Sequence, residues 1–194
     1  AGVRLFIAMV VRFFPQYRLA QQTVSSGQLG KLGVMKFKRI GYQPTGDEGW
    51  FTNETRSGGM VVDLMIHDFD YARWLGGEIK QVFAKSIRSK NPDAPSDYAL
   101  VNLSFTSGTM ALIEGGWVYP PGIFRTSFDI AGSDGLLEWK SDDAVTLQPF
   151  LKPKETTTIA RVGVPSSILD EDPYTTEIKH AYDCIKNNKP FLVT

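Results

Sequence analysis

The 194-residue sequence has one cysteine, no excess of either charge and no long apolar run. A single cysteine, Cys184, excludes a disulfide framework and any cysteine-rich metal site, and it fits a reducing compartment. Lys plus Arg number 21 and Asp plus Glu number 21, so the net charge is zero. The basic excess that phosphate backbones attract is therefore missing, and we expect no nucleic-acid partner.

The longest uninterrupted apolar run, Leu5 to Val11, is much shorter than the roughly 20 residues of a membrane span. It leads into Arg12 without the small-residue pattern of a signal-peptide cleavage site. Apolar residues make up 42% of the chain, enough for a sizeable core. We expect a single folded domain that is cytoplasmic and has no membrane partner.

The first half of the chain predicts helices around one strand and one long loop. The unbroken apolar run within 3–11 is typical of a strand covered on both faces, as in a parallel sheet. Helical spacing predicts a helix over 15–25, and weak alternation predicts a strand over 32–40. Residues 41–57 are rich in Gly, Thr, Asn and Pro and predict a loop. A second helix is expected over 59–75, closed by two glycines.

The second half predicts an antiparallel meander followed by one helix. Asp172 and Pro173 supply the N-cap and first turn of that helix, with Tyr174, Ile178, Ala181 and Ile185 as its apolar stripe. Together with the earlier helices this indicates an α+β fold: a large, open-faced, mainly antiparallel sheet with helices on one face. The strands are expected at 79–87, 98–105, 109–117, 125–131, 136–139, 144–147 and 155–160.

The predicted helix over 59–75 carries the main candidate site. It is apolar almost all round, yet Asp63, His67 and Asp70 follow the spacing i, i+4, i+7 on one stripe. Buried charges must be paired or must face a wet cavity. A carboxylate one turn before a histidine orients the ring and raises its pKa toward neutrality, which suits proton transfer.

Two other interpretations of this stripe remain open. In the first, Asp70 pairs with Arg73 and His67 is a hydrogen-bonded core residue. In the second, Asp63, His67 and Asp70 bind a metal ion. The rest of the sequence supplies no recognisable pattern of further His or Cys ligands, and one helix face rarely completes a coordination sphere. We therefore expect no metal.

The segment from Ser57 to Gly76, SGGMVVDLMIHDFDYARWLG, resembles the signature of the Gfo/Idh/MocA oxidoreductases, the relatives of glucose–fructose oxidoreductase and inositol dehydrogenase. Three further segments support the resemblance. They are Arg12-Phe13 with Pro15 and Gly27 to Gly30, then Gly132 to Leu137, and Tyr174 with Glu177-Ile178.

The family combines an N-terminal Rossmann domain, which binds NAD or NADP, with a C-terminal α+β domain that has an open-faced sheet. This sequence lacks a Gly-x-Gly-x-x-Gly fingerprint after a strand and the family's Glu-Lys-Pro motif. The resemblance therefore implies that residues 1–12 are the last strand of a Rossmann domain. Residues 13–194 would be the C-terminal substrate-binding and oligomerisation domain, cut short at its end.

The resemblance implies hydride transfer between a sugar, polyol or related hydroxy compound and NAD or NADP, held mainly by the Rossmann domain. His67 would take the hydroxyl proton while Asp63 holds the imidazole in place. Arg12 and Tyr174 are implied substrate-binding residues. The residues themselves leave alternatives: Arg12 pairs with a carboxylate, or Tyr174 is the first core residue of its helix.

Four weaker expectations complete the site. Trp50, in the long loop, is expected to close over the substrate, although loop aromatics often only pack. Gly58 and Gly59 would let the cofactor approach the backbone closely. Asp68, off the stripe, is expected to be a solvated or structural charge. His180 has no carboxylate one turn away and is expected at the surface.

The second face of the sheet is expected to carry apolar side chains, with Trp117, Phe128 and Trp139 available for it. An open apolar sheet face pairs readily with a copy of itself, which predicts a homodimer or higher homo-oligomer. Two other functions stay open. One is a non-catalytic, sugar-responsive regulator, since the family includes a transcriptional corepressor. The other is a free-standing sugar-binding module.

Overall fold

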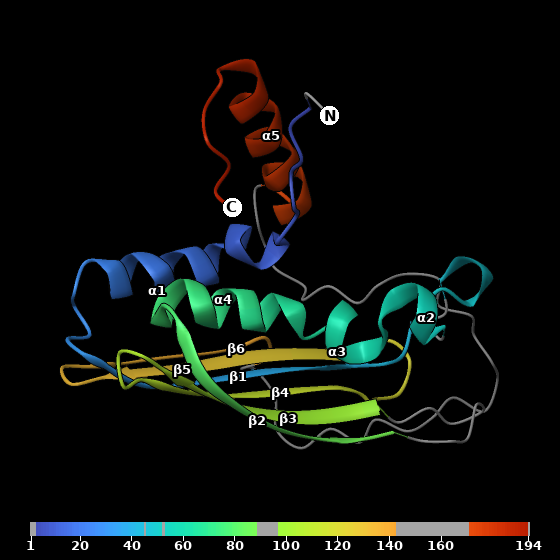
Figure 1. The fold of residues 1–194 in the computed structure, drawn as a ribbon, viewed down its shortest axis with the longest axis horizontal. Coiled ribbons are helices and arrows are strands. Elements are labelled where there is room, and N and C mark those ends of the chain that lie inside the picture. Colours follow the sequence, from blue (N-terminus) through green and yellow to red (C-terminus); the bar gives the residue numbers. More distant parts are fainter. Residues whose placement is uncertain (1–2, 45, 52, 89–96, 143–170, 194) are drawn as a thin grey trace.

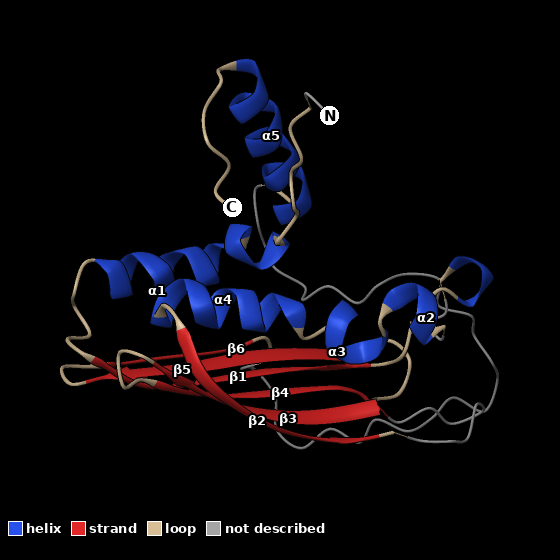
Figure 2. Ribbon diagram, viewed as in Figure 1, coloured by secondary structure: helices blue, strands red, loops and turns tan. Residues whose placement is uncertain are grey.

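The fold is seen in a computed structural model that describes residues 3–44, 46–51, 53–88, 97–142 and 171–193. One sheet of six strands lies under a layer of helices, and a final helix stands apart from both (Figure 1). All the labelled helices lie on the same side of the sheet (Figure 2). The expected class, α+β with an open-faced and mainly antiparallel sheet, is confirmed. The strands expected at 144–147 and 155–160 fall outside the described residues.

The sheet has the strand order β2-β3-β4-β1-β5-β6. Four of its five strand pairs are antiparallel, and β1 pairs with β4 in parallel. The sequence predicts a simple meander, but β1 from early in the chain lies between β4 and β5 instead. The strands are β1 (Leu32–Gly41), β2 (Ile79–Ile87), β3 (Asp97–Phe105), β4 (Met110–Trp117), β5 (Phe124–Gly132) and β6 (Leu136–Lys140).

Alternation of side chains places the core between the sheet and the helices. On β1, Met35 and Phe37 are buried while Lys36 and Lys38 point to the other face. The helix layer consists of α1 (Pro15–Ser25), α3 (Gly59–Asp63) and α4 (Ile66–Gly76), and the short helices η2 (Asp47–Gly49) and α2 (Glu54–Ser57) lie in the long loop. The helix expected over 15–25 is confirmed residue for residue.

The helix expected over 59–75 is broken at Leu64 and Met65. The amide groups of both residues donate to the Met60 carbonyl oxygen, at 2.8 and 3.3 Å, so the regular ladder stops there. The packing of Met65 accompanies this break. Its side chain is fully buried against Gly115 of β4, where a Cβ would lie 2.3 Å from Met65 Cγ. The break therefore lets α3 and α4 follow the sheet in different directions.

The final helix, α5 (Pro173–Lys186), packs on the N-terminal segment and on the 3₁₀ helix η1 (Val10–Phe13) rather than on the sheet (Figure 1). In this chain residues 3–9 have no regular structure and residues 10–13 are helical, so the strand expected over 3–11 does not form here, and its assignment to a Rossmann sheet stays a prediction. A strand needs a hydrogen-bonding neighbour. The described strands all lie in the separate sheet layer, and this segment contacts α5 instead.

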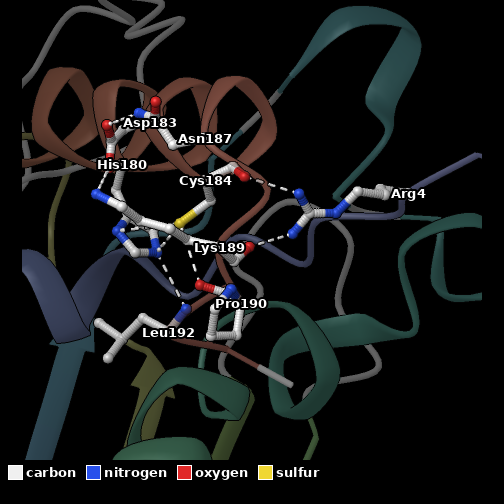
Figure 3. A network of polar contacts seen from close by, with 8 residues as sticks. All are labelled: Arg4, His180, Asp183, Cys184, Asn187, Lys189, Pro190 and Leu192. Carbon is white, nitrogen blue, oxygen red and sulfur yellow. Dashed lines mark hydrogen bonds and ion pairs between the residues drawn. The ribbon is translucent and has the colours of Figure 1, made fainter.

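Polar contacts hold α5 to the segments around it (Figure 3). Arg4 donates from Nη1 to the Cys184 carbonyl oxygen at 2.7 Å and from Nη2 to that of Lys189. The amide of Leu192 donates to His180 Nε2 at 3.0 Å. His180 also faces the Phe13 ring at 5.4 Å. The expectation that His180 is a plain surface residue is therefore wrong, because it joins the chain's last described residues to α5.

The apolar stripe expected on α5 points outward. Ile178 and Ile185 are 68% and 57% exposed, whereas Pro173, Glu177 and Cys184 are buried. The reason is the helix's placement: its other side meets η1 and the residues before it.

The expected apolar residues of the open sheet face are also wrong. Trp117 and Phe128 are buried, and Trp139 packs against the same core on the helix side. The open face carries other apolar side chains, among them Val34, Phe83 and Met110, together with the cross-strand ion pairs Lys36–Asp129 at 4.0 Å and Lys38–Glu114 at 3.6 Å.

Candidate active site

His67 lies in the first turn of α4 and is half-buried. Its Nδ1 atom is buried and has no hydrogen-bond partner among the described residues. Burial and, next, the positive charge of Arg39 together lower the pKa of His67 to about 4, against the opposing effects of Asp68 and Asp70. The structure therefore places a neutral imidazole here, and the expected increase in its pKa is wrong.

Asp63 ends α3, on the other side of the helix break from His67. Its carboxyl group is half-buried, and burial raises its pKa. Within the described part of the chain, neither a hydrogen bond nor an ion pair joins Asp63 to His67. Spacing of i, i+4 brings two side chains together only on a continuous helix, and the helix here is interrupted at Leu64 and Met65.

Arg12, in η1, is held by Asp70, the third member of the stripe. Its Nε donates to Asp70 Oδ2 at 2.7 Å and its Nη2 to Oδ1 at 2.6 Å, while Nη1 donates to the Leu192 carbonyl oxygen at 2.9 Å. The guanidinium also lies 4.7 Å from the centre of the Trp74 ring. All three nitrogen atoms thus have protein partners. This is the carboxylate pairing that the sequence left open as an alternative.

Asp68 is almost fully buried, so it is a structural charge and not a solvated one. It forms a second two-bond ion pair with Arg39 of β1: Nε to Oδ2 is 2.7 Å and Nη2 to Oδ1 is 3.0 Å. Arg39 also reaches the Tyr17 hydroxyl at 3.4 Å, and Tyr71 donates to the Tyr17 carbonyl oxygen at 2.6 Å. This buried cluster ties α1, β1 and α4 together directly beside His67.

Sequence reasoning missed Arg39, although its position carries a signal. Along β1 the inward positions of the two-residue period are Met35, Phe37 and residue 39. An arginine at an inward strand position requires a buried carboxylate partner. The sequence alone does not tell which carboxylate supplies that partner, because Asp68 is adjacent to Arg39 only through the packing of α4 on the sheet.

Tyr174 begins α5 and remains 40% exposed, which does not fit a core residue. Burial of part of the ring raises the pKa of its hydroxyl, and Arg39 acts in the opposite direction. Arg39 therefore influences both His67 and Tyr174. The structure brings His67, Arg12 and Tyr174 to the junction of α4, η1 and α5.

Trp50, Gly58 and Gly59 lie in the segment around α2, at the far end of the helix layer from α5 (Figure 1). The Arg56 guanidinium covers the Trp50 ring at 4.9 Å from its centre. Gly58 and Gly59 have φ of 78° and 73°, a backbone conformation that favours glycine. They line a cavity of about 120 Å³ with Glu54, Arg88, Asp97 and Tyr98.

The described residues contain no group of three His, Cys, Asp or Glu side chains placed to hold a metal ion. None of their helices combines the length and the apolar character that a bilayer crossing requires.

The fold is an α+β domain with one open-faced mixed sheet. Residues 17–138 match the family described as GFO/IDH/MocA C-terminal domain, and the chain belongs to this family. It is 27% identical over its full length to scyllo-inositol 2-dehydrogenase (NAD(+)) of Bacillus subtilis, of which it covers 56%. It is 30% identical over 119 residues to myo-inositol 2-dehydrogenase of Thermotoga maritima, covering 59% of this chain and 34% of that protein.

Solved structures show the same fold. GenD2 from gentamicin A biosynthesis, solved in complex with NAD, aligns with all of this chain and 57% of its own at a TM-score of 0.73 and 20% identity. A probable dehydrogenase from Thermotoga maritima aligns with 99% of this chain and 58% of its own, at a TM-score of 0.72 and 24% identity. The chain spans little more than half the length of the relatives that it matches in full.

Proposed function

We propose that this chain is the catalytic and substrate-binding domain of an NAD-dependent dehydrogenase that acts on a cyclic polyol or sugar, with His67 as the general base. The observation that carries the proposal is the His67 ring, neutral and half-buried, with its buried Nδ1 unpartnered. The family and the inositol dehydrogenases among the relatives support the reaction class.

The chemistry at His67 is a proton transfer. As the substrate carbinol carbon loses its hydrogen with both bonding electrons, the hydroxyl oxygen forms the second bond to carbon and its proton passes to the imidazole. NAD, held by a dinucleotide-binding domain, supplies the acceptor for the hydride. A histidine with a pKa of about 4 is fully neutral at pH 7 and needs no prior deprotonation.

Asp63 is the second catalytic residue that we propose. Among the described residues its carboxyl group has no ion-pair partner, and it stands one residue before the helix break at Leu64 and Met65, which separates it from His67. A carboxylate in this position stabilises the imidazolium that forms when His67 takes the proton.

Tyr174 would contact the substrate on the α5 side of this pair. Contacts of Trp50 with the substrate and of Gly58 and Gly59 with the cofactor would require a site that extends along the helix layer to α2. Tyr174 is partly exposed beside the Arg39 charge, so its hydroxyl is available as a hydrogen-bond donor. All three nitrogen atoms of the Arg12 guanidinium donate to Asp70 or to Leu192. Its contribution to substrate binding would therefore be indirect: it would hold η1, α4 and the segment around Leu192 in place.

We also propose that the open sheet face joins copies of the chain into a homo-oligomer. Cross-strand rows place Phe83, Leu100, Met110, Val34 and Leu136 on that face, all at least 39% exposed. Light scattering on the intact protein tests this. Phe83→Glu and Met110→Glu together should shift the protein to a smaller species, whereas an unchanged mass would exclude this face.

The reaction itself is tested by screening inositol isomers and monosaccharides with NAD on the intact protein and following NADH formation. The proposal expects a turnover with at least one of these compounds that disappears in His67→Ala. Turnover that survives in His67→Ala would remove the histidine from the mechanism.

A further inference from the structure

Arg39 and Asp68 form the most deeply buried ion pair of the described residues: Arg39 is 5% exposed and Asp68 is 1% exposed. Both bonds of the pair are short and both carboxylate oxygens are used. A buried ion pair is weak evidence for a role in stability, because well-packed apolar residues of similar volume often replace such a pair without loss. Its position relative to the reacting group is therefore informative.

That position is directly beside His67. Asp68 is the next residue in the chain and lies in the same first turn of α4. Its amide group donates to the Met65 carbonyl oxygen at 3.0 Å, which closes that turn. Asp68 is fixed by the guanidinium, so the backbone at the base of the His67 side chain is fixed as well. Arg39 is in turn anchored by the Tyr17 hydroxyl and by its place on the central strand β1.

We propose that Arg39, clamped by Asp68, is a positioning residue for His67: the ion pair fixes the first turn of α4, which carries the imidazole. The catalytic part of this inference rests on the proposed function of His67. The effect of Arg39 on the imidazole ring is independent of that function. A fixed positive charge beside the ring disfavours the imidazolium whether or not a substrate is present.

The other charged groups around the junction do not supply this effect. Asp68 and Asp70 both favour the imidazolium, and Asp70 is neutralised by Arg12 from η1. Other titratable groups on the surrounding elements include Tyr17 on α1, Asp63 on α3, Tyr71 on α4, and Tyr174, Glu177 and His180 on α5, and none of them is among the charges that shift the His67 pKa. Among the groups that act on His67 through their charge, Arg39 alone opposes protonation, and its effect exceeds that of either carboxylate.

The neutral state of the His67 ring has a consequence for proton transfer. A ring that stays neutral down to low pH is unprotonated over the whole physiological range and releases a proton readily, but it is a weaker base than a histidine with a pKa near 7. The charge of the same guanidinium also acts to lower the pKa of Tyr174, so one buried charge affects the pKa of two residues of the proposed site.

The test compares two variants of the intact protein, Arg39→Gln and the double variant Arg39→Met/Asp68→Leu. His67 titration is followed by NMR of ring-labelled histidine and assigned with His67→Asn. We expect the His67 pKa to rise in Arg39→Gln, which keeps the Asp68 carboxylate, and to change less in the double variant, which removes the opposing carboxylate as well. In Arg39→Gln the acid limb of the pH profile of kcat/KM should move in the same direction, and the plateau should fall because the first turn of α4 is no longer held.

Lys36→Met/Asp129→Leu is the matched control, because it removes an ion pair from the same strand on the opposite face of the sheet. It should leave the His67 pKa unchanged. An unchanged His67 pKa together with an unchanged kcat/KM plateau in folded Arg39→Gln overturns the proposal. The NMR titration does not require activity, so a failed assignment of His67 as the base is distinguished from a failed assignment of Arg39. If the double variant does not fold, Arg39→Gln still decides.

Discussion

The Arg12 guanidinium binds the Asp70 carboxylate through two parallel hydrogen bonds of 2.7 and 2.6 Å, and its third nitrogen binds the Leu192 carbonyl oxygen. One side chain thus ties η1, α4 and the chain's last described residues together, one turn beyond His67. The pair is nearly buried, with 11% and 14% of the two side chains exposed. Two-bond pairs in such surroundings are among the stronger polar contacts.

We expect Arg12→Ala to lower the free energy of unfolding by about 2–3 kcal/mol, because it leaves the Asp70 carboxylate unpaired in a partly buried site. Chemical denaturation of the intact protein measures this loss. Lys36→Ala, at an exposed pair 4.0 Å apart, is the control and should cost less than about 1 kcal/mol. Equal losses in the two variants would show that the Arg12–Asp70 pair contributes no more to the free energy of unfolding than the exposed Lys36–Asp129 pair.

A second prediction concerns Glu177, whose pKa burial raises to about 7. Between the unfolded carboxyl pKa near 4.5 and about 7, the folded state holds a proton that the unfolded state has released, so stability falls as pH rises. Glu177→Gln mimics the protonated form. We expect it to stabilise the protein by about 2 kcal/mol at pH 8 and to have little effect at pH 4.5.

Thermal unfolding at several pH values measures the effect of Glu177→Gln. Glu171→Gln is the control near the start of the same helix, because Lys179 lowers the pKa of that exposed carboxyl group. Its replacement should bring no gain at high pH. A gain for Glu177→Gln that is equal at pH 4.5 and pH 8 would show that ionisation of Glu177 is not the cause.

Gly115 provides a prediction about the helix break. A Cβ at this position would lie 2.3 Å from Met65 Cγ, so Gly115→Ala must displace the fully buried side chain that sits at the break. We expect a loss of about 1–3 kcal/mol and a lower kcat, because displacing Met65 also moves the first turn of α4, where His67 lies. The control is Gly33→Ala on β1, where the nearest atom is 3.8 Å away. Equal Tm values for the two variants would contradict the role given to Gly115.

The strands and most helices could be predicted because their signals are local. Alternation along β2 to β6, the proline at the start of α1 and the Asp172 cap of α5 all depend on neighbours in the sequence. The insertion of β1 between β4 and β5 could not be predicted, since strand order depends on packing between distant segments. The apolar stripe of α5 was predicted correctly as a pattern, but a pattern does not say which surface covers it.

The candidate site shows the same division. The spacing of Asp63, His67 and Asp70 singles out the right helix, yet the break at Leu64 and Met65 depends on Met65 packing into Gly115 across the sheet. The low pKa of His67 depends on Arg39, which is 28 residues away in sequence and is brought near by tertiary packing. Helical spacing alone therefore predicted a pKa shift of the wrong sign.

The central claim, that His67 is the proton acceptor, is tested most directly by measuring kcat and Tm on the same sample of His67→Ala in the intact protein. General base catalysis is typically worth ~10²–10⁴ in rate, so kcat should fall by that factor. The Tm should change little, because the ring is half-buried and its Nδ1 has no partner to lose. Asp63→Asn should reduce kcat less than His67→Ala. A His67→Ala protein with unchanged kcat and a much lower Tm would contradict the claim and identify His67 as a structural residue.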